Sequence, residues 1–169
     1  MITFAAIIFQ TLLKMKRLFL VLTVALMSMG AMAQSKGDLG AGINLLYGTE
    51  IKNFGVGGKV QYMLTDNLRG EGSFDYFFEK DDLNMWNANA NVHYLCPIAD
   101  NTKFYPIVGL GLANIYSDMV HNSVKLCLNL GAGIQQDVAQ DLALTAEGKY
   151  QIINNHNQFV AAIGVIYKF

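Results

Sequence analysis

The sequence predicts an all-β fold, an eight-stranded antiparallel up-and-down β-barrel that spans a membrane. Eight segments alternate apolar and polar residues, and this period of two is typical of β-strands because successive side chains point to opposite faces. Clusters of turn-forming residues separate the segments. Each segment has about ten residues, the length that crosses a bilayer at a tilt.

The stretch NANANVHYL at residues 87–95 has the strictest alternation. One parity holds three asparagines and a histidine, and the other holds Ala, Ala, Val and Tyr. In a soluble barrel the asparagines point outward, whereas in a barrel set in lipid they point inward. A soluble barrel and a membrane barrel are different kinds of protein, so the choice between them depends on which parity faces the interior.

The first half of the barrel comes from four predicted strands. They span 38–48, 54–64, 68–78 and 83–95, with turn residues TDN at 65–67 and EKDD at 79–82. One parity in them is apolar, and it includes Leu45, Val60, Phe74 and Val92.

The second half also comes from four strands. They span 103–116, 124–136, 142–153 and 158–169, with turn residues PIADN at 97–101, DMVHN at 118–122, DVAQD at 137–141 and NNHN at 154–157. Here the apolar parity includes Val108, Leu128, Leu144 and Ile163.

The charged residues within the strands all lie on the other parity. They include Lys59, Arg69, Glu71, Asp75, Lys125, Glu147, Lys149 and Lys168. Ten of the 16 glycines share this parity, and only Gly58, Gly70, Gly72 and Gly148 lie on the apolar one. Because an eight-stranded barrel has little interior space, glycine is expected on its inner face. The charged face therefore points inward.

The apolar face must then point outward, and a belt of that size is stable only in hydrocarbon. Aromatic residues near the strand ends agree with interfacial girdles. One rim carries Tyr62, Tyr94, Phe104, Tyr167 and Phe169, and the other carries Tyr47, Phe54, Phe78, Trp86 and Tyr116.

Residues 1–33 have the pattern of a secretory signal peptide. A basic start at Met15, Lys16 and Arg17 precedes the apolar run LFLVLTVALMSMG and the small-residue site Ala31-Met32-Ala33. Translation starts either at residue 15 or at residue 1 with a long signal. The mature chain, 34–169, is predicted to be a single outer-membrane β-barrel domain.

Removal of residues 1–33 takes away three of the 12 basic residues and none of the 13 acidic ones. The mature net charge is then about −4, which excludes a basic surface for nucleic acid. Cys96 and Cys127 fall at opposite ends of the predicted barrel, so we expect two free thiols.

The segment LTDNLRGEGSFDYFF and the terminal stretch GVIYKF, with the eight strands and the signal peptide, resemble the small outer-membrane β-barrels of the OmpA, OmpX and opacity types. The resemblance covers the whole mature chain. It implies a location in a Gram-negative outer membrane and a C-terminal assembly signal at Gly164, Tyr167 and Phe169. Ala162 departs from that signal, which has a polar residue at this position.

The inward polar residues predict a connected network inside the barrel. Its members are Lys59, Arg69, Glu71, Asp75, Asn89, Asn91, His93, Lys125, Glu147 and Lys149. A buried charge must be paired or hydrogen-bonded, so we expect these residues to rigidify the barrel and to leave little open lumen. The alternative is a small porin-like channel for ions or small solutes.

A catalytic role is not expected. Ser73, His93 and Glu71 all point inward, but Ser73 lies mid-strand and His93 near the periplasmic end, which disfavours a lipid-modifying enzyme. His121 and His156 lie in loops without flanking ligands, so neither a metal nor a cofactor is predicted. A soluble lipocalin-like ligand carrier is the remaining alternative.

The loops complete the prediction. Residues 48–53, 79–82, 117–123 and 154–157 are expected to face the cell exterior, and 65–67, 96–102 and 137–141 the periplasm. The expected partners are outer-membrane lipid, lipopolysaccharide and, during biogenesis, the barrel-assembly machinery. The sequence favours a structural or surface-interaction role.

Overall fold

The computed structural model describes residues 36–80, 83–117, 120–153 and 157–169. The barrel is one compact unit of the chain. The predicted signal peptide, 1–33, lies outside the described residues, as do Asp81, Asp82 and His156. In the described part of the chain, no helix is long and apolar enough to cross a membrane.

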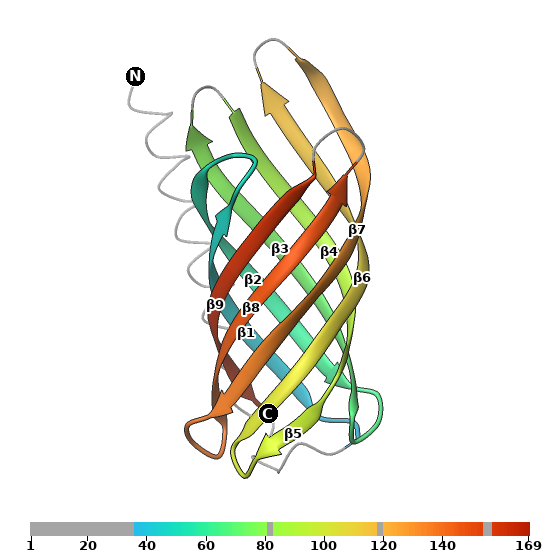
Figure 1. Ribbon diagram of the computed structural model, residues 1–169, viewed down its shortest axis with the longest axis vertical. Coiled ribbons are helices and arrows are strands. Elements are labelled where there is room, and N and C mark those ends of the chain that lie inside the picture. Colours follow the sequence, from blue (N-terminus) through green and yellow to red (C-terminus); the bar gives the residue numbers. More distant parts are fainter. Residues whose placement is uncertain (1–35, 81–82, 118–119, 154–156) are drawn as a thin grey trace, which may run out of the picture. The chain divides into compact units, whose positions relative to one another are not determined.

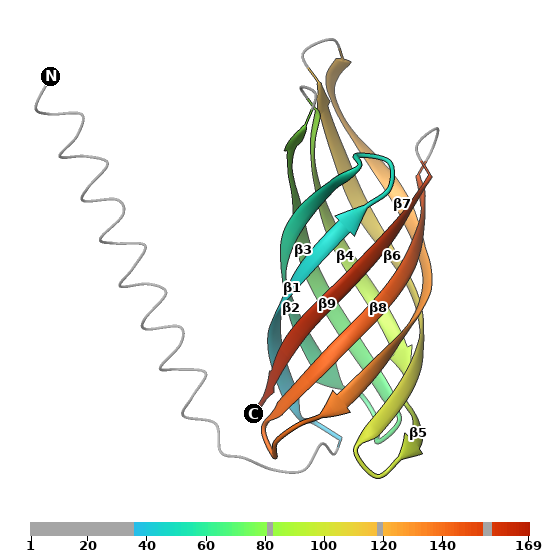
Figure 2. The same cartoon turned by 60° about the vertical axis from the view of Figure 1, so that its left-hand side comes forward.

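Eight long antiparallel strands wrap into a closed barrel (Figures 1 and 2). The strands are β1 (Leu39–Gly48), β2 (Asn53–Met63), β3 (Leu68–Lys80), β4 (Leu83–Tyr94), β6 (Thr102–Ser117), β7 (Val120–Asp137), β8 (Leu142–Ile153) and β9 (Gln158–Lys168). Strands adjacent in sequence are adjacent in the sheet, and the β1–β9 pairing closes it. The predicted fold class is confirmed.

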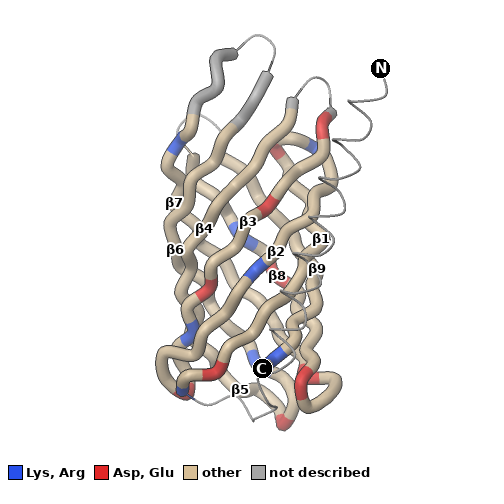
Figure 3. The backbone as a smooth tube through the Cα atoms, turned by 180° about the vertical axis from the view of Figure 1, so that it is seen from behind, with Lys and Arg blue, Asp and Glu red and all other residues tan. Residues whose placement is uncertain are grey.

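The exposed fraction of whole residues shows which face points outward. Leu128 and Leu144 are 38% and 46% exposed, whereas Lys149 and Glu147 are 0% and 6% exposed. Charged positions nevertheless occur along the strands as well as at the turns (Figure 3). The barrel therefore has an apolar outer wall and a polar interior, the reverse of a soluble protein.

Glycine positions follow the same division. A Cβ on Gly131 of β7 would lie 2.9 Å from the Cα of Lys149, and one on Gly133 would lie 2.5 Å from the Tyr105 ring. A Cβ on the outward Gly58 or Gly72 would meet nothing within 4 Å. The inward glycines thus make space for the large side chains of the interior.

Most strands end within two residues of their predicted bounds, but two elements differ more. A short strand, β5 (Cys96–Ala99), pairs with the start of β6 inside the segment that was expected to be a turn. β7 begins at Val120 instead of residue 124, so that residues 120–122 are strand although DMVHN was expected to turn. Polar residues at a strand end can continue the backbone hydrogen bonds of the sheet, and their turn propensity does not reveal this.

Aromatic side chains cluster on the outer wall of the first four strands. Tyr47 meets Phe54 edge-on with ring centroids 5.3 Å apart, and Phe74 stacks on Trp86 at 5.8 Å. Both predicted rims carry exposed rings, including Tyr62 and Tyr94 at the end of the barrel where Leu39 and Lys168 lie. Phe169 was expected on the same rim but is only 8% exposed. The side chain of Tyr116 is outside the described residues.

The two ends of the barrel are distinguished by the first residues of β1 and the last residues of β9, which lie together. The terminal end contains the start of β1, the end of β9 and the turns between β2 and β3 and between β7 and β8. The distal end contains the loop between β1 and β2, residues 49–52.

Candidate functional site

Four charged side chains meet in the middle of the barrel. The Nζ atom of Lys59 lies 2.6 Å from Oε1 of Glu147 and 3.8 Å from Oε2 of Glu71, and Lys149 Nζ lies 3.9 Å from Glu147 Oε2. These side chains are at most 1% exposed. A buried pair of opposite charges offsets its desolvation only with good geometry and further hydrogen bonds.

Neutral partners supply those hydrogen bonds. Gln61 donates to Glu71 at 2.8 Å and Asn91 donates to its other oxygen at 3.2 Å. The hydroxyl of Tyr105 donates to Glu147 at 2.9 Å. The carboxylates thus accept from amide and phenol groups as well as from lysine, which makes the charge cluster a connected network.

Arg69 and His93 form a second group toward the terminal end. Arg69 donates to Nδ1 of His93 at 3.0 and 3.3 Å and to Gln135 at 2.6 Å, and its guanidinium lies 4.7 Å from the centre of the Tyr105 ring. Because arginine only donates, Nδ1 is the acceptor and the proton of a neutral ring is on Nε2. That atom lies 3.7 Å from Glu71, so this group is continuous with the charge cluster.

Amide side chains occupy the next stretch of the interior toward the distal end. Asn129 donates to Asn89 and Asn91, each at 3.0 Å, and Gln151 donates to Asn129 at 3.0 Å. Asn89 also donates to Asp75 at 3.1 Å. These contacts join β3, β4, β7 and β8 across the barrel and answer where the asparagines of residues 87–95 point.

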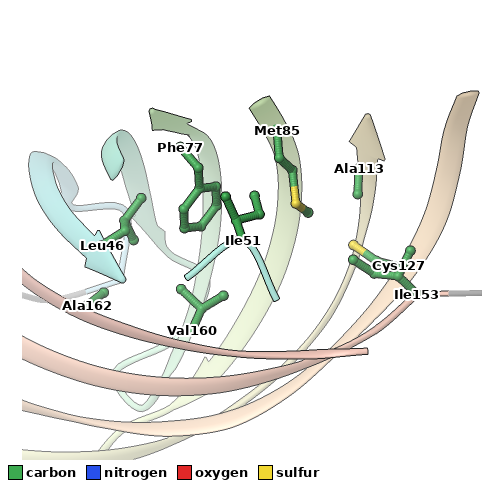
Figure 4. Close-up of a cluster of buried hydrophobic side chains, with 9 residues drawn as sticks. All are labelled: Leu46, Ile51, Phe77, Met85, Ala113, Cys127, Ile153, Val160 and Ala162. Atoms are coloured by element: carbon green, nitrogen blue, oxygen red, sulfur yellow. The ribbon is translucent and has the colours of Figure 1, made fainter. Parts of the chain in front are cut away.

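Apolar side chains lie on either side of this polar core. The distal cluster consists of Leu46, Ile51, Phe77, Met85, Ala113, Cys127, Ile153, Val160 and Ala162 (Figure 4). The terminal cluster consists of Met63, Leu95, Tyr105 and Ile107. Every member of both clusters is at most 7% exposed. The polar core is therefore enclosed by apolar packing at both ends.

Some buried polar atoms in the core have no hydrogen-bond partner within the described protein. They include both amide atoms of Asn44, Oδ1 of Asp75, Oε2 of Glu147 and Nζ of Lys149. A buried ammonium or carboxylate oxygen needs such a partner, and internal water is the usual one.

The terminal rim has its own ion pairs. Asp137 lies 3.4 Å from Lys103 and 3.2 Å from Lys168, and Gln135 donates to it at 2.8 Å. Phe104, a residue of the aromatic girdle, is paired with Ile134. Asp137 follows Ile134 by three residues and so lies beyond the girdle, toward the terminal end. Partial burial raises the pKa of Asp137, but the Gln135 hydrogen bond and the two lysine charges outweigh it and hold the pKa below its ordinary value.

A comparison with protein families gives the family of this chain. The family described as "Outer membrane protein beta-barrel domain" matches residues 19–169. The chain belongs to this outer-membrane barrel family. Membership implies that the barrel resides in an outer membrane. A search among curated proteins gives no match.

Solved outer-membrane barrels have the same fold. The N-terminal β-barrel domain of Pseudomonas aeruginosa OprF superposes with a TM-score of 0.71 at 18% identity, covering 80% of this chain and 100% of that one. Neisserial surface protein A gives 0.64 at 18% identity, with coverages of 78% and 96%. Ail of Yersinia pestis gives 0.58 at 20% identity, with coverages of 79% and 99%. At these identities the likeness concerns the fold alone.

Within this outer-membrane barrel, the structure brings together most of the residues expected in the network. Lys59, Arg69, Glu71, Asp75, Asn89, Asn91, His93, Glu147 and Lys149 are all buried and linked directly or through neighbours. Lys125 is half-buried on the inward parity of β7, two residues from Cys127 toward the distal end. Lys168 lies at the terminal rim with Asp137 rather than in the core.

The other expected sites are placed as follows. Ser73 accepts a hydrogen bond from Asn89, whereas His93 contacts Arg69 and Glu71. In the proposed assembly signal, Gly164 lies beside Asn44 and Thr145, and Tyr167 is 40% exposed on the outer wall. Cys96 and Cys127 are free thiols, as predicted. No cluster of three potential metal ligands occurs among the described residues.

Sequence reasoning missed two features of the interior. Tyr105 follows the outward Phe104 and so has inward parity, but no tyrosine was assigned to the interior. The inward apolar residues at the distal end of the strands, such as Leu46, Phe77 and Val160, were likewise not identified. Parity alone could have found both sets. Ile51 was expected to face the cell exterior with its loop, but it is 7% exposed and packs inside the barrel.

Proposed function

We propose that this outer-membrane barrel is a non-catalytic structural or surface-interaction protein whose polar core makes the barrel rigid. The observation that carries the proposal is the enclosure of the charge cluster by apolar packing at both ends. An open pore needs a continuous water path, and these clusters interrupt it.

The proposal includes an orientation and a route. Residues 1–33 direct export and are cleaved, and the assembly machinery recognises Gly164, Tyr167 and Phe169. The terminal end then faces the periplasm and the distal end the cell exterior. Lipid and lipopolysaccharide contact the outer wall, which the exposed Leu, Val and Phe side chains support.

The side-chain contacts support the absence of catalysis. A serine nucleophile needs a base within hydrogen-bond reach. Ser73 bonds instead to Asn89, and His93 is held by Arg69 in a barrel interior without an exposed edge. A lipid ester would have to enter that enclosed core.

The unpartnered polar atoms of the core favour a second candidate, a narrow channel for ions or small solutes. Water bound at Asp75 and Lys149 would form a segment of such a path. In this case the apolar clusters are constrictions that open.

Two measurements on the purified protein test the proposal. We expect heat-modifiable gel migration in detergent, because a closed barrel resists unfolding until it is boiled. In a planar bilayer, we expect no steady single-channel current. A steady current in the wild-type protein would instead establish the channel, and migration that does not change on heating would contradict the barrel itself.

A further inference from the structure

The loop between β1 and β2 carries an apolar side chain into the barrel. Ile51 is only 7% exposed, although its neighbours Glu50 and Lys52 are exposed. Figure 4 shows Ile51 among Phe77, Met85 and Val160, which come from three different strands. Ile51, a loop residue, is thus buried in the distal mouth of the barrel.

Polar contacts hold the loop on both sides. The backbone N–H of Thr49 donates to the carbonyl of Phe159 at 3.0 Å, and the N–H of Phe159 donates to the Thr49 hydroxyl at 2.9 Å. On the other side, Asn53 Nδ2 donates to the carbonyls of Phe78 and Glu79 at 3.0 and 3.3 Å. These contacts fix the loop ends to β9 and β3, so that residues 50–52 span the mouth between them.

The backbone between these anchors is in an unfavourable conformation. Lys52 has a φ of 53°, in the left-handed region that residues other than glycine rarely adopt. Such a conformation persists only where its surroundings enforce it. The contacts at Thr49 and Asn53 and the burial of Ile51 together hold this loop conformation.

We propose that residues 49–52 form a hinged plug, in which Ile51 closes the distal mouth and its withdrawal admits water to the polar core. Thr49 and Asn53, whose contacts hold the two loop ends, are the hinges. This inference goes beyond the proposed function, since it holds whether the barrel serves as a scaffold or as a surface protein.

The side chains beneath Ile51 define what its withdrawal exposes. Met85 Sδ accepts a contact from Gln158 Nε2 at 3.5 Å, and Gln158 donates to Gln151 at 2.7 Å, so the amide network begins directly under the plug. Cys127 belongs to the same apolar cluster, is 1% exposed, and lies 3.8 Å from Asn89 and Asn129. Its thiol is therefore a natural reporter of water entry.

The experiment measures how fast a charged methanethiosulfonate reagent modifies Cys127 in vesicle-inserted protein that carries Cys96→Ser. We expect slow modification with Ile51 present and a rate at least about tenfold higher in Ile51→Ser, which equals about 1.4 kcal/mol in the opening equilibrium. Ile51→Val retains the apolar contact and should keep the slow rate. Glu50→Ser is the matched control in the same loop and should also stay slow.

A second assay does not depend on the fold of Ile51→Ser. In a protein lacking both native cysteines, we expect a thiol at position 51 (Ile51→Cys) to react much more slowly than one at position 50 (Glu50→Cys). Equal rates at the two positions would overturn the plug. So would fast modification of Cys127 in the presence of Ile51, or an unchanged Cys127 rate in a folded Ile51→Ser protein.

Discussion

At the scale of single residues, Glu147 is the centre of the interior. It accepts from Lys59 and Tyr105, lies near Lys149, and is 6% exposed. Each of these three groups has lost its contact with bulk water. Glu147 therefore serves all three of them, and removal of its charge has consequences for each, although Glu71 also lies 3.8 Å from Lys59.

We predict that Glu147→Gln destabilises the barrel by about 3 to 5 kcal/mol, because buried Lys149 loses its 3.9 Å contact with a carboxylate and Lys59 keeps only the longer contact with Glu71. Unfolding by urea in lipid vesicles, followed by the fluorescence of Trp86, measures the change; Trp86 is the one tryptophan of the chain.

The exposed Asp100→Asn provides the control for Glu147→Gln and should have little effect. The double variant Lys59→Met with Glu147→Leu should recover part of the loss, because it removes two members of the cluster together. A Glu147→Gln protein as stable as the wild type would show that the pair does not support the fold.

The residue scale also marks the limit of sequence reasoning. Period-two parity assigns Lys59 and Glu147 to the interior, but it does not say that they touch. Their contact joins residues 88 positions apart. It depends on the stagger between strands across the barrel, which hydrophobic alternation does not encode.

At the scale of elements, β7 and β8 depend on glycine for their close approach. A Cβ on Gly131 would lie 2.9 Å from Lys149 Cα and 3.1 Å from Lys149 Cγ, and it would also contact the Gly148 carbonyl. The strand could not accept this atom without moving away from its neighbour or displacing the buried lysine.

We predict that Gly131→Ala destabilises the barrel by about 1 to 3 kcal/mol through overpacking. Gly72→Ala on the outer wall of β3 is the matched control, since the added Cβ meets nothing within 4 Å. It should be neutral or stabilise slightly, because alanine restricts the unfolded chain. The urea midpoint in vesicles distinguishes the two, and equal midpoints would contradict the assignment of the inner face.

The predicted element boundaries agree closely with the structure where turn residues are compact. β8 is found at the predicted residues, 142–153, because DVAQD and NNHN bound it clearly. The start of β7 was wrong because polar side chains in a distal hairpin resemble a turn. β5 was missed because a strand of four residues is too short for alternation to be detected.

At the scale of the whole molecule, the outer wall is matched to hydrocarbon. Ile43 of β1 is 72% exposed and is paired with Gly58 and Val165, midway between the two aromatic rims. Ile98 has a similar exposure, 62%, but lies in β5 at the terminal end. The two isoleucines differ in depth rather than in contact with the protein.

We predict that Ile43→Arg costs about 2 to 4 kcal/mol and that Ile98→Arg costs about 0 to 1 kcal/mol, because a lipid-facing charge is penalised according to its depth in the bilayer. Refolding yield into vesicles, read from heat-modifiable migration, compares them. If both variants insert equally well, the apolar belt does not face lipid.

The pairing of β1 with β9 has a consequence for how the molecule is made. These strands lie side by side from Gly40 and Lys168 to Gly48 and Val160. The backbone groups along that seam find partners only after the final residues arrive, and hydrocarbon tolerates no unpaired ribbon. A chain that ends before residue 158 lacks β9 and cannot close into a barrel. We expect cells to degrade such fragments rather than to insert them.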